Sequence, residues 1–339
     1  MTIQATSAAN IESSAADLIV AFPDNRLLID LCGEFDKNLT QVEKALDIQI
    51  VRRGNELALV GDPDIALKTQ AVLETMYLRL EQGKELLSAD IDAVIRFGNS
   101  SENTGVRDGD QIEMFSAGGT EIRTRKKTVE PRTPTQKLYV QKLFKHELVF
   151  GLGPAGTGKT YLAVAAAVSM FIEGQVDRII LSRPAVEAGE RLGFLPGDMK
   201  DKVDPYMQPL YDALNDFLPA NQLAKLIEDK KIEIAPLAFM RGRTLANAFV
   251  VLDEAQNATT MQMKMFLTRM GQGSHMAITG DTSQIDLPRG VPSGLVEAKK
   301  VLSNVKGIGF TQFDVSDVVR HPMVAKIIQA YDKNAKRNG

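Results

Sequence analysis

A glycine-rich segment between a predicted strand and a predicted helix constrains this 339-residue chain more than any other feature. The segment fits the pattern GxxxxGK[ST], which requires this strand–turn–helix context. Its glycines let backbone N–H groups surround a phosphate, and the helix N-terminus adds a favourable partial charge. We therefore predict a loop whose lysine neutralises the β and γ phosphates and whose last threonine ligates Mg²⁺. The predicted phosphate-binding residues are Gly153, Pro154, Ala155, Gly156, Thr157, Gly158, Lys159 and Thr160.

A second motif is an apolar stretch, FVVL, that ends abruptly in two acids, Asp253 and Glu254. It is similar to a Walker B motif. In that role Asp253 would hold the magnesium shell, and Glu254 would orient or deprotonate the attacking water. The alternative is a buried strand followed by an acidic helix start.

A third motif, ITGDTSQ, again carries a predicted strand into polar residues at the carboxyl edge of a sheet, where ligands gather in such folds. It is similar to the GDxxQ motif of superfamily 1 helicases, and Gln284 would then sense the γ-phosphate. Gln136 precedes the phosphate loop at the distance where superfamily 1 motors place a glutamine that reads adenine. Its amide offers the donor and acceptor that the adenine edge needs, so ATP is the predicted nucleotide. The alternative is an ordinary surface glutamine.

From Gln136 onward, short apolar runs alternate with helical patterns. This alternation predicts an α/β domain with a mainly parallel sheet covered on both faces. We assign residues 135–339 to this domain.

The N-terminal part predicts a flexible leader over residues 1–20 and a small α/β domain over residues 21–98. Its predicted order is β-α-β-β-α, followed by a further helix. The elements are a strand over Arg26–Cys32, a helix over Phe35–Asp47, a hairpin around Gly54-Asn55, a long helix capped by Asp64 and a helix over Ala89–Phe97.

This order resembles a minimal KH-like RNA-binding module. A KH domain grips the RNA backbone with a GXXG loop, but the corresponding residues here, Gly33 to Asp36, lack the second glycine and carry two acids. The alternative is a module for packing or assembly.

Residues 99–134 change to Ser, Asn, Gly, Thr and charged residues, which predicts a linker, with a hairpin as one form it could take. Its last part is basic and could contact a phosphate backbone or be ordinary solvated surface. The charged residues are Arg123, Arg125, Lys126, Lys127 and Arg132 against Glu121 and Glu130.

The chain has 40 basic and 43 acidic residues, so its formal net charge is −3 and any nucleic-acid surface must be a local patch. Its single cysteine, Cys32, rules out an intramolecular disulfide. The N-terminal residues lack the basic and apolar regions of a signal peptide, and no apolar stretch near them approaches the ~20 residues that span a bilayer. We expect a cytosolic protein without a membrane segment.

Taken together, the blocks TPTQKLYV, VFGLGPAGTGKTYLAVA, LSRPAVEAGERLGFLPGD, FMRGRTLANAFVVLDEAQN, TGDTSQIDLP and DVVRHPMV resemble the PhoH family. The resemblance covers about Thr133 to Ile328, and Ser182 to Asp198 is its most distinctive block. With the KH-like region in front, it is closest to the bacterial PhoH-like proteins. The resemblance implies a RecA-like P-loop ATPase linked to RNA processing and ribosome maturation, with single-stranded or ribosomal RNA as a partner.

A superfamily 1 helicase places ATP between two RecA-like cores, but only residues 255–339 follow Glu254, too few for a second core. The arginine that stabilises the transferring phosphoryl group must then come from the same core or from a neighbouring subunit. Arg320 is the leading candidate, followed by Arg183, Arg241 and Arg243. The family resemblance suggests a hexameric ring. An arginine in trans would need such a ring.

These observations predict an ATP- and Mg²⁺-dependent hydrolase acting on RNA, with Lys159, Glu254, Gln284 and Arg320 as catalytic residues. The alternative is a nucleotide-switched adaptor that assembles with an endoribonuclease or another RNA-processing protein and unwinds nothing.

Overall fold

A computed structural model describes residues 18–98, 121–184 and 199–319, which fall into two compact units. The described residues of the N-terminal unit are 18–98, and the C-terminal unit ends at Val319. The predicted leader up to residue 17 and the predicted catalytic residue Arg320 lie outside the described residues. In the part of the chain that is described, no helix is long and apolar enough to cross a membrane.

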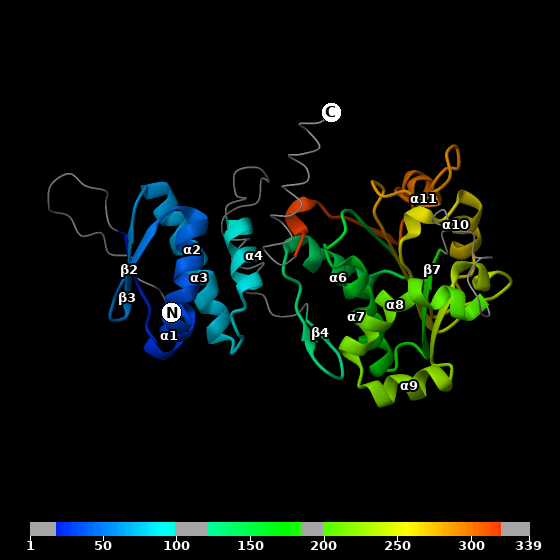
Figure 1. Cartoon of the computed structure of the whole chain (residues 1–339), viewed down its shortest axis with the longest axis horizontal. Helices are drawn as coiled ribbons and strands as arrows, with labels where there is room; N and C mark the ends of the chain where they lie inside the picture. Colours follow the sequence, from blue (N-terminus) through cyan, green and yellow to red (C-terminus); the bar gives the residue numbers. More distant parts are fainter. Residues whose placement is uncertain (1–17, 99–120, 185–198, 320–339) are drawn as a thin grey trace. The chain divides into compact units, whose positions relative to one another are not determined.

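In the N-terminal unit, α2 and α3 pack against a three-stranded antiparallel sheet of order β1-β3-β2, and α4 packs against these two helices (Figure 1). Apolar residues from the strands and from α1 to α4 form a single core. The order is β-α-α-β-β-α with one further helix, and the Gly33–Asp36 turn joins the first two helices. The elements are β1 (Leu18–Ala21), α1 (Asn25–Cys32), η1 (Glu34–Asp36), α2 (Lys37–Leu46), β2 (Gln49–Arg53), β3 (Glu56–Val60), α3 (Pro63–Glu81) and α4 (Ser88–Gly98).

The predicted strand over Arg26–Cys32 is wrong, because this segment is the helix α1. Asp24 caps the helix by accepting a hydrogen bond from the Arg26 N–H at 2.7 Å. The buried side chains, Leu28, Leu31 and Cys32, follow the three- and four-residue spacing of a helix face rather than the alternation of a strand.

Two further boundaries differ from the prediction. Leu18–Ala21 is a strand paired with β3, so residues 18–20 of the predicted leader are part of the sheet. The long helix α3 is capped by Asp62, whose carboxylate accepts from the Asp64 and Ile65 N–H groups, and not by Asp64. The predicted hairpin is confirmed, with β2 and β3 joined at Gly54, whose φ is 64°.

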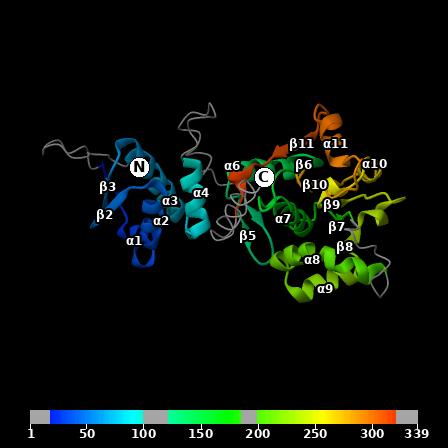
Figure 2. The same ribbon diagram turned by 45° about the horizontal axis from the view of Figure 1, so that its top comes forward.

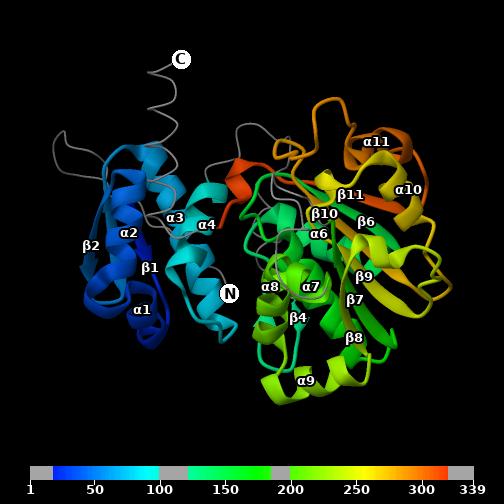
Figure 3. The ribbon, with the colours of Figure 1, turned by 45° about the vertical axis from the view of Figure 1, so that its right-hand side comes forward.

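The C-terminal unit is built on a six-stranded sheet in which every adjacent pair is parallel, with order β11-β6-β10-β9-β7-β8 (Figure 3). The predicted mainly parallel α/β fold is therefore confirmed. The strands are β6 (Leu148–Leu152), β7 (Arg178–Arg183), β8 (Ile232–Pro236), β9 (Ala248–Leu252), β10 (His275–Gly280) and β11 (Ile308–Gln312). The helices are α6 (Pro134–Lys145), α7 (Lys159–Ile172), α8 (Met199–Phe217), α9 (Ala220–Glu228), η4 (Leu237–Met240), η5 (Ala255–Asn257), α10 (Thr260–Leu267), α11 (Gly294–Leu302) and η6 (Val315–Asp317).

Both faces of this sheet are buried, as the apolar strands require. Val149 and Val251 face a core shared with α6, α7 and α8, while Phe150 and Val250, one residue along each strand, face a core shared with α10 and α11. Figures 2 and 3 show these helices on the two sides of the strands, with α9 beside α8 at the β8 edge.

The predicted linker ends earlier than expected. The two-stranded hairpin of β4 (Ile122–Arg123) and β5 (Thr128–Val129) belongs to the C-terminal unit. Its buried side chains, Ile122 and Val129, join the core of α7 and α8. The C-terminal unit therefore includes this hairpin and does not begin at residue 135.

Candidate functional site

The glycine-rich loop follows β6 and ends at the first turn of α7, in the context that the sequence predicts. Three of its glycines, Gly153, Gly156 and Gly158, have positive φ values of 140°, 85° and 80°. Gly153 also passes so close to the end of β11 that a Cβ on it would lie 2.4 Å from the Phe313 carbonyl oxygen. The loop thus needs glycine for both backbone conformation and close packing.

Lys159, the first residue of α7, is only 8% exposed and turns back over the loop. Its Nζ donates to the carbonyl oxygens of Gly153 and Pro154, each at 2.6 Å, and to Thr157 Oγ1 at 3.3 Å. The ammonium group therefore lies against the loop whose backbone would bind a phosphate. A bound phosphate would replace these carbonyl contacts with a charge-assisted interaction.

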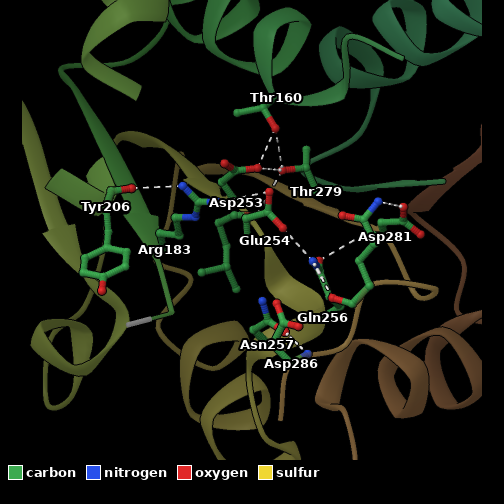
Figure 4. Close-up of polar contacts among 12 residues, drawn as sticks. Thr160, Arg183, Tyr206, Asp253, Glu254, Gln256, Asn257, Thr279, Asp281 and Asp286 are labelled. Atoms are coloured by element: carbon green, nitrogen blue, oxygen red, sulfur yellow. Dashed lines mark hydrogen bonds and ion pairs between the residues drawn. The ribbon is translucent and has the colours of Figure 1, made fainter. Parts of the chain in front are cut away.

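Thr160, Asp253 and Thr279 meet at the carboxyl ends of neighbouring strands (Figure 4). Thr160 Oγ1 donates to Asp253 Oδ1 at 2.5 Å, Thr279 Oγ1 donates to the same oxygen at 2.9 Å, and the two hydroxyl oxygens are 3.2 Å apart. Thr279 is part of this group because β10 lies between β6 and β9 in the sheet. Hydroxyl and carboxylate oxygens beside a phosphate loop suit Mg²⁺, which takes one or two protein carboxylates together with phosphate oxygens.

Glu254, directly after Asp253, has a left-handed backbone with φ 50° and ψ 37°. Both of its carboxylate oxygens have partners. Oε1 lies 3.1 Å from Arg183 Nη2, and Oε2 accepts from Gln256 Nε2 at 2.6 Å. Figure 4 shows Glu254 between these two side chains, one at the end of β7 and the other in η5.

Gln256 is 1% exposed and connects the second motif with the third. Besides Glu254, its amide N–H group donates to the Gln284 carbonyl at 3.2 Å, and its Oε1 accepts from the Asp281 N–H at 3.0 Å. The predicted phosphate sensor Gln284 donates its own amide to Asp281 Oδ2 at 2.9 Å. The structure therefore joins Glu254 and the Asp281–Gln284 turn through one buried glutamine.

Gln136 is buried beneath the phosphate loop, where its side chain donates to the Thr157 carbonyl at 3.0 Å and accepts from the Arg132 N–H at 2.7 Å. It therefore supports the loop directly, and adenine recognition by the same amide stays a prediction. Beside it, Val319 donates its N–H to the Gly156 carbonyl at 3.0 Å, so the chain after β11 also contacts the loop.

The candidate arginine fingers have different surroundings. Arg183 donates to the Tyr206 carbonyl at 2.9 Å as well as pairing with Glu254. Arg243 forms a two-pronged ion pair with Glu233, with N–O distances of 2.6 and 2.7 Å, and these hydrogen bonds raise its pKa. Arg241 is exposed on the turn after η4. Of the three that the structure describes, Arg183 contacts a predicted catalytic residue.

The predicted basic patch is partly used inside the unit. Lys127 pairs with Asp216 at 2.8 Å and lies over the rings of Tyr161 and Phe217, while Lys126 Nζ donates to the Asn215 carbonyl at 2.7 Å. Burial favours a lower pKa for Lys127, but the hydrogen bonds to Asp216 and Tyr161 outweigh it and raise the pKa. Two of the predicted phosphate contacts thus anchor the hairpin to the end of α8.

Three contacts at the candidate site were not predicted from the sequence. They are the hydroxyl of Thr279 beside Asp253, the bridge made by Gln256 and the pairing of Arg183 with Glu254. The first two had a weak signal in the sequence, because Thr279 belongs to the TGD motif and Gln256 to the DEAQ motif. Arg183 was a candidate arginine finger, but its pairing with Glu254 had no sequence signal because the pairing depends on strand register.

The sheet order and the contacts around the glycine-rich loop define an α/β protein of the P-loop nucleotide-binding class. Within that class, the family model described as "PhoH-like protein" matches residues 128–332. The chain is 49% identical to a PhoH-like protein of Bacillus subtilis over 314 residues, which are 92% of this chain and 95% of that protein. It is 46% identical to a PhoH-like protein of Mycobacterium bovis, over 90% of this chain and 85% of that protein. The chain belongs to the PhoH-like family.

Among solved structures, the chain is similar to the SWI2/SNF2 ATPase core of Sulfolobus solfataricus in complex with dsDNA. The sequence identity is 15%, the TM-score is 0.35, and the similarity covers 64% of this chain and 55% of that one. A TM-score this low adds nothing to the fold that the strand order already defines.

Proposed function

We propose that this protein hydrolyses ATP with Mg²⁺. The observation that carries the proposal is the meeting of Thr160, Asp253 and Thr279 beside the Lys159 loop, with Glu254 next along the chain. Lys159 would neutralise phosphate charge, and Glu254 would orient the attacking water. Mg²⁺ held by Thr160 and Asp253 would neutralise charge on the β and γ phosphate oxygens.

Two substitutions separate nucleotide binding from hydrolysis. Lys159→Ala removes a phosphate contact and should lose both ATP affinity and turnover. Glu254→Gln removes only the carboxylate charge, so it should retain ATP affinity and lose turnover. Lys306→Ala and Glu297→Gln, which change exposed side chains of the same kinds, serve as controls. An undiminished hydrolysis rate in Glu254→Gln would refute the role given to this residue.

We further propose that the energy of hydrolysis is used on RNA. The β-α-α-β-β-α order of the N-terminal unit and the helicase-like third motif support this part of the proposal. The Gly33–Asp36 turn carries two acids and an exposed Phe35, so contact there would rest on base stacking rather than on phosphate. We also propose that the protein acts in the cytosol.

The proposed arginine finger is Arg320, supplied by a neighbouring subunit of a hexameric ring. Arginine fingers contribute on the order of 10³ or more in rate, so a dilute monomer should bind ATP and scarcely hydrolyse it. Mixing inactive Glu254→Gln subunits with inactive Arg320→Ala subunits should restore turnover, because some interfaces then combine an intact glutamate with an intact arginine. Constant specific activity on dilution and no recovery in the mixture would show that one chain completes the site.

The alternative is a nucleotide-switched adaptor for an endoribonuclease or another RNA-processing protein. Repeated unwinding of a tailed RNA duplex would favour the motor. Slow hydrolysis that RNA does not stimulate, together with nucleotide-dependent binding of such an enzyme, would favour the adaptor.

A further inference from the structure

An ion pair joins the proposed water-orienting residue to a strand outside the phosphate loop. Arg183 is the last residue of β7, and Glu254 follows β9, the parallel neighbour of β7 in which Leu252 pairs with Ser182. Strand register therefore brings the two side chains together although they lie far apart in the sequence. The N–O distance is 3.1 Å, and the side chains are 23% and 36% exposed.

Arg183 is itself fixed at this position. Its other terminal nitrogen, Nη1, donates to the Tyr206 carbonyl of α8 at 2.9 Å, so the planar guanidinium bridges α8 and the Glu254 carboxylate. Because this fork is rigid, a guanidinium held on one side also limits the positions of the carboxylate on the other.

This arrangement is unfavourable for the chemistry proposed for Glu254. The residue must direct a carboxylate oxygen to a water molecule in line with the γ-phosphate. Here Gln256 holds Oε2, so the oxygen left for the water is Oε1, and it faces the guanidinium. The backbone also has a left-handed conformation that glutamate rarely adopts. Strain of this kind persists where surrounding contacts enforce it and is often found at switch regions.

We propose that Arg183 is a restraint on Glu254, which holds the carboxylate in a resting position and must be released before each hydrolysis step. Arg183 is thus a positioning residue of the ATPase site. The inference rests on the proposed ATPase function.

The test measures steady-state ATP hydrolysis at saturating ATP for the full chain and for Arg183→Gln. Removing the restraint should raise kcat about fivefold, which corresponds to about 1 kcal/mol at 1.36 kcal/mol per tenfold change in rate. Nucleotide affinity should not change. Arg178→Gln is the matched control, because Arg178 lies on the same strand at the opposite edge of the sheet and contacts the Ala246 carbonyl. It should leave kcat unchanged.

Ionic strength provides a readout that a merely structural role would not give. Salt screens a part-exposed ion pair, so raising KCl from about 0.05 to about 0.5 M should increase kcat of the wild type and not that of Arg183→Gln. Arg183→Lys keeps the charge but not the fork, and it should give a smaller rise. This second variant also provides the test if Arg183→Gln does not fold.

The failures can be told apart. If the wild type hydrolyses ATP and kcat is unchanged or lower in both Arg183 variants, Arg183 does not restrain Glu254. If both variants lose turnover altogether, Arg183 instead assists the phosphoryl transfer. Absence of ATP hydrolysis in the wild type and in every variant would refute the ATPase proposal itself.

Discussion

Gln256→Met should remove the hydrogen bonds that link Glu254 to the Asp281–Gln284 turn and should also destabilise the C-terminal unit. Methionine keeps the length of the side chain but makes none of the three hydrogen bonds to Glu254, Gln284 and Asp281. The buried Asp281 N–H loses its acceptor, which costs about 1–3 kcal/mol, and loss of the bond to the part-exposed Glu254 carboxylate adds about 1 kcal/mol. The sum of about 2–4 kcal/mol should lower Tm by roughly 4–16 °C in a unit of this size.

The same variant should reduce kcat at least tenfold, because no hydrogen bonds then link the Asp281–Gln284 turn to Glu254 through residue 256. Glu254 would still be held by its ion pair with Arg183. Thermal denaturation and single-turnover hydrolysis measure the two effects separately. Gln272→Met is the control, since Gln272 is exposed on the turn before β10. If Tm and kcat both stay at wild-type values in Gln256→Met, the bridge has no role in either stability or catalysis.

Two other substitutions test the hairpin and the phosphate loop. Lys127→Gln should lower Tm by no more than about 4 °C, since a largely exposed ion pair contributes up to ~1 kcal/mol. The hydrogen bond from Lys127 lowers the pKa of Asp216 below its ordinary 3.8. The difference in Tm between the wild type and Lys127→Gln should therefore be complete at neutral pH and disappear as the pH falls through the lowered pKa. A difference in Tm that persists in strong acid would contradict the ion pair. Gly153→Ala should abolish nucleotide binding and lower Tm more than Gly174→Ala. Both glycines have positive φ, but a Cβ on Gly153 would overlap Phe313, whereas a Cβ on Gly174 would meet no other atom. Equal losses of Tm in the two variants would show that the backbone conformation alone determines the loss.

The main parts of the candidate phosphate site could be predicted because they lie in short contiguous motifs. A glycine-rich loop, a lysine and a threonine adjoin in the chain, so their spacing alone defines the nest and the start of α7. Asp253 could be added because an apolar strand that ends in acids must bring them to the carboxyl edge of a parallel sheet. The structure confirms that Thr160 and Asp253 meet there.

The N-terminal unit shows where a local pattern is ambiguous. The apolar run in Arg26–Cys32 is short enough to fit a strand or a helix, and periodicity cannot decide between them at that length. The Asp24 cap and the core formed with α2 and α3 select the helix.

The sequence by itself therefore determined the glycine-rich loop and the acidic strand end of the candidate site, the parallel α/β class of the C-terminal unit and the family. The tertiary structure alone decided that Arg183 pairs with Glu254, that Thr279 joins Asp253 and that Lys127 anchors a hairpin. The physical reason is that local patterns record which side chains are buried and what chemistry they carry. Contacts between distant residues depend on strand order and register, and these are fixed only when β10 packs between β6 and β9 and when β7 aligns with β9.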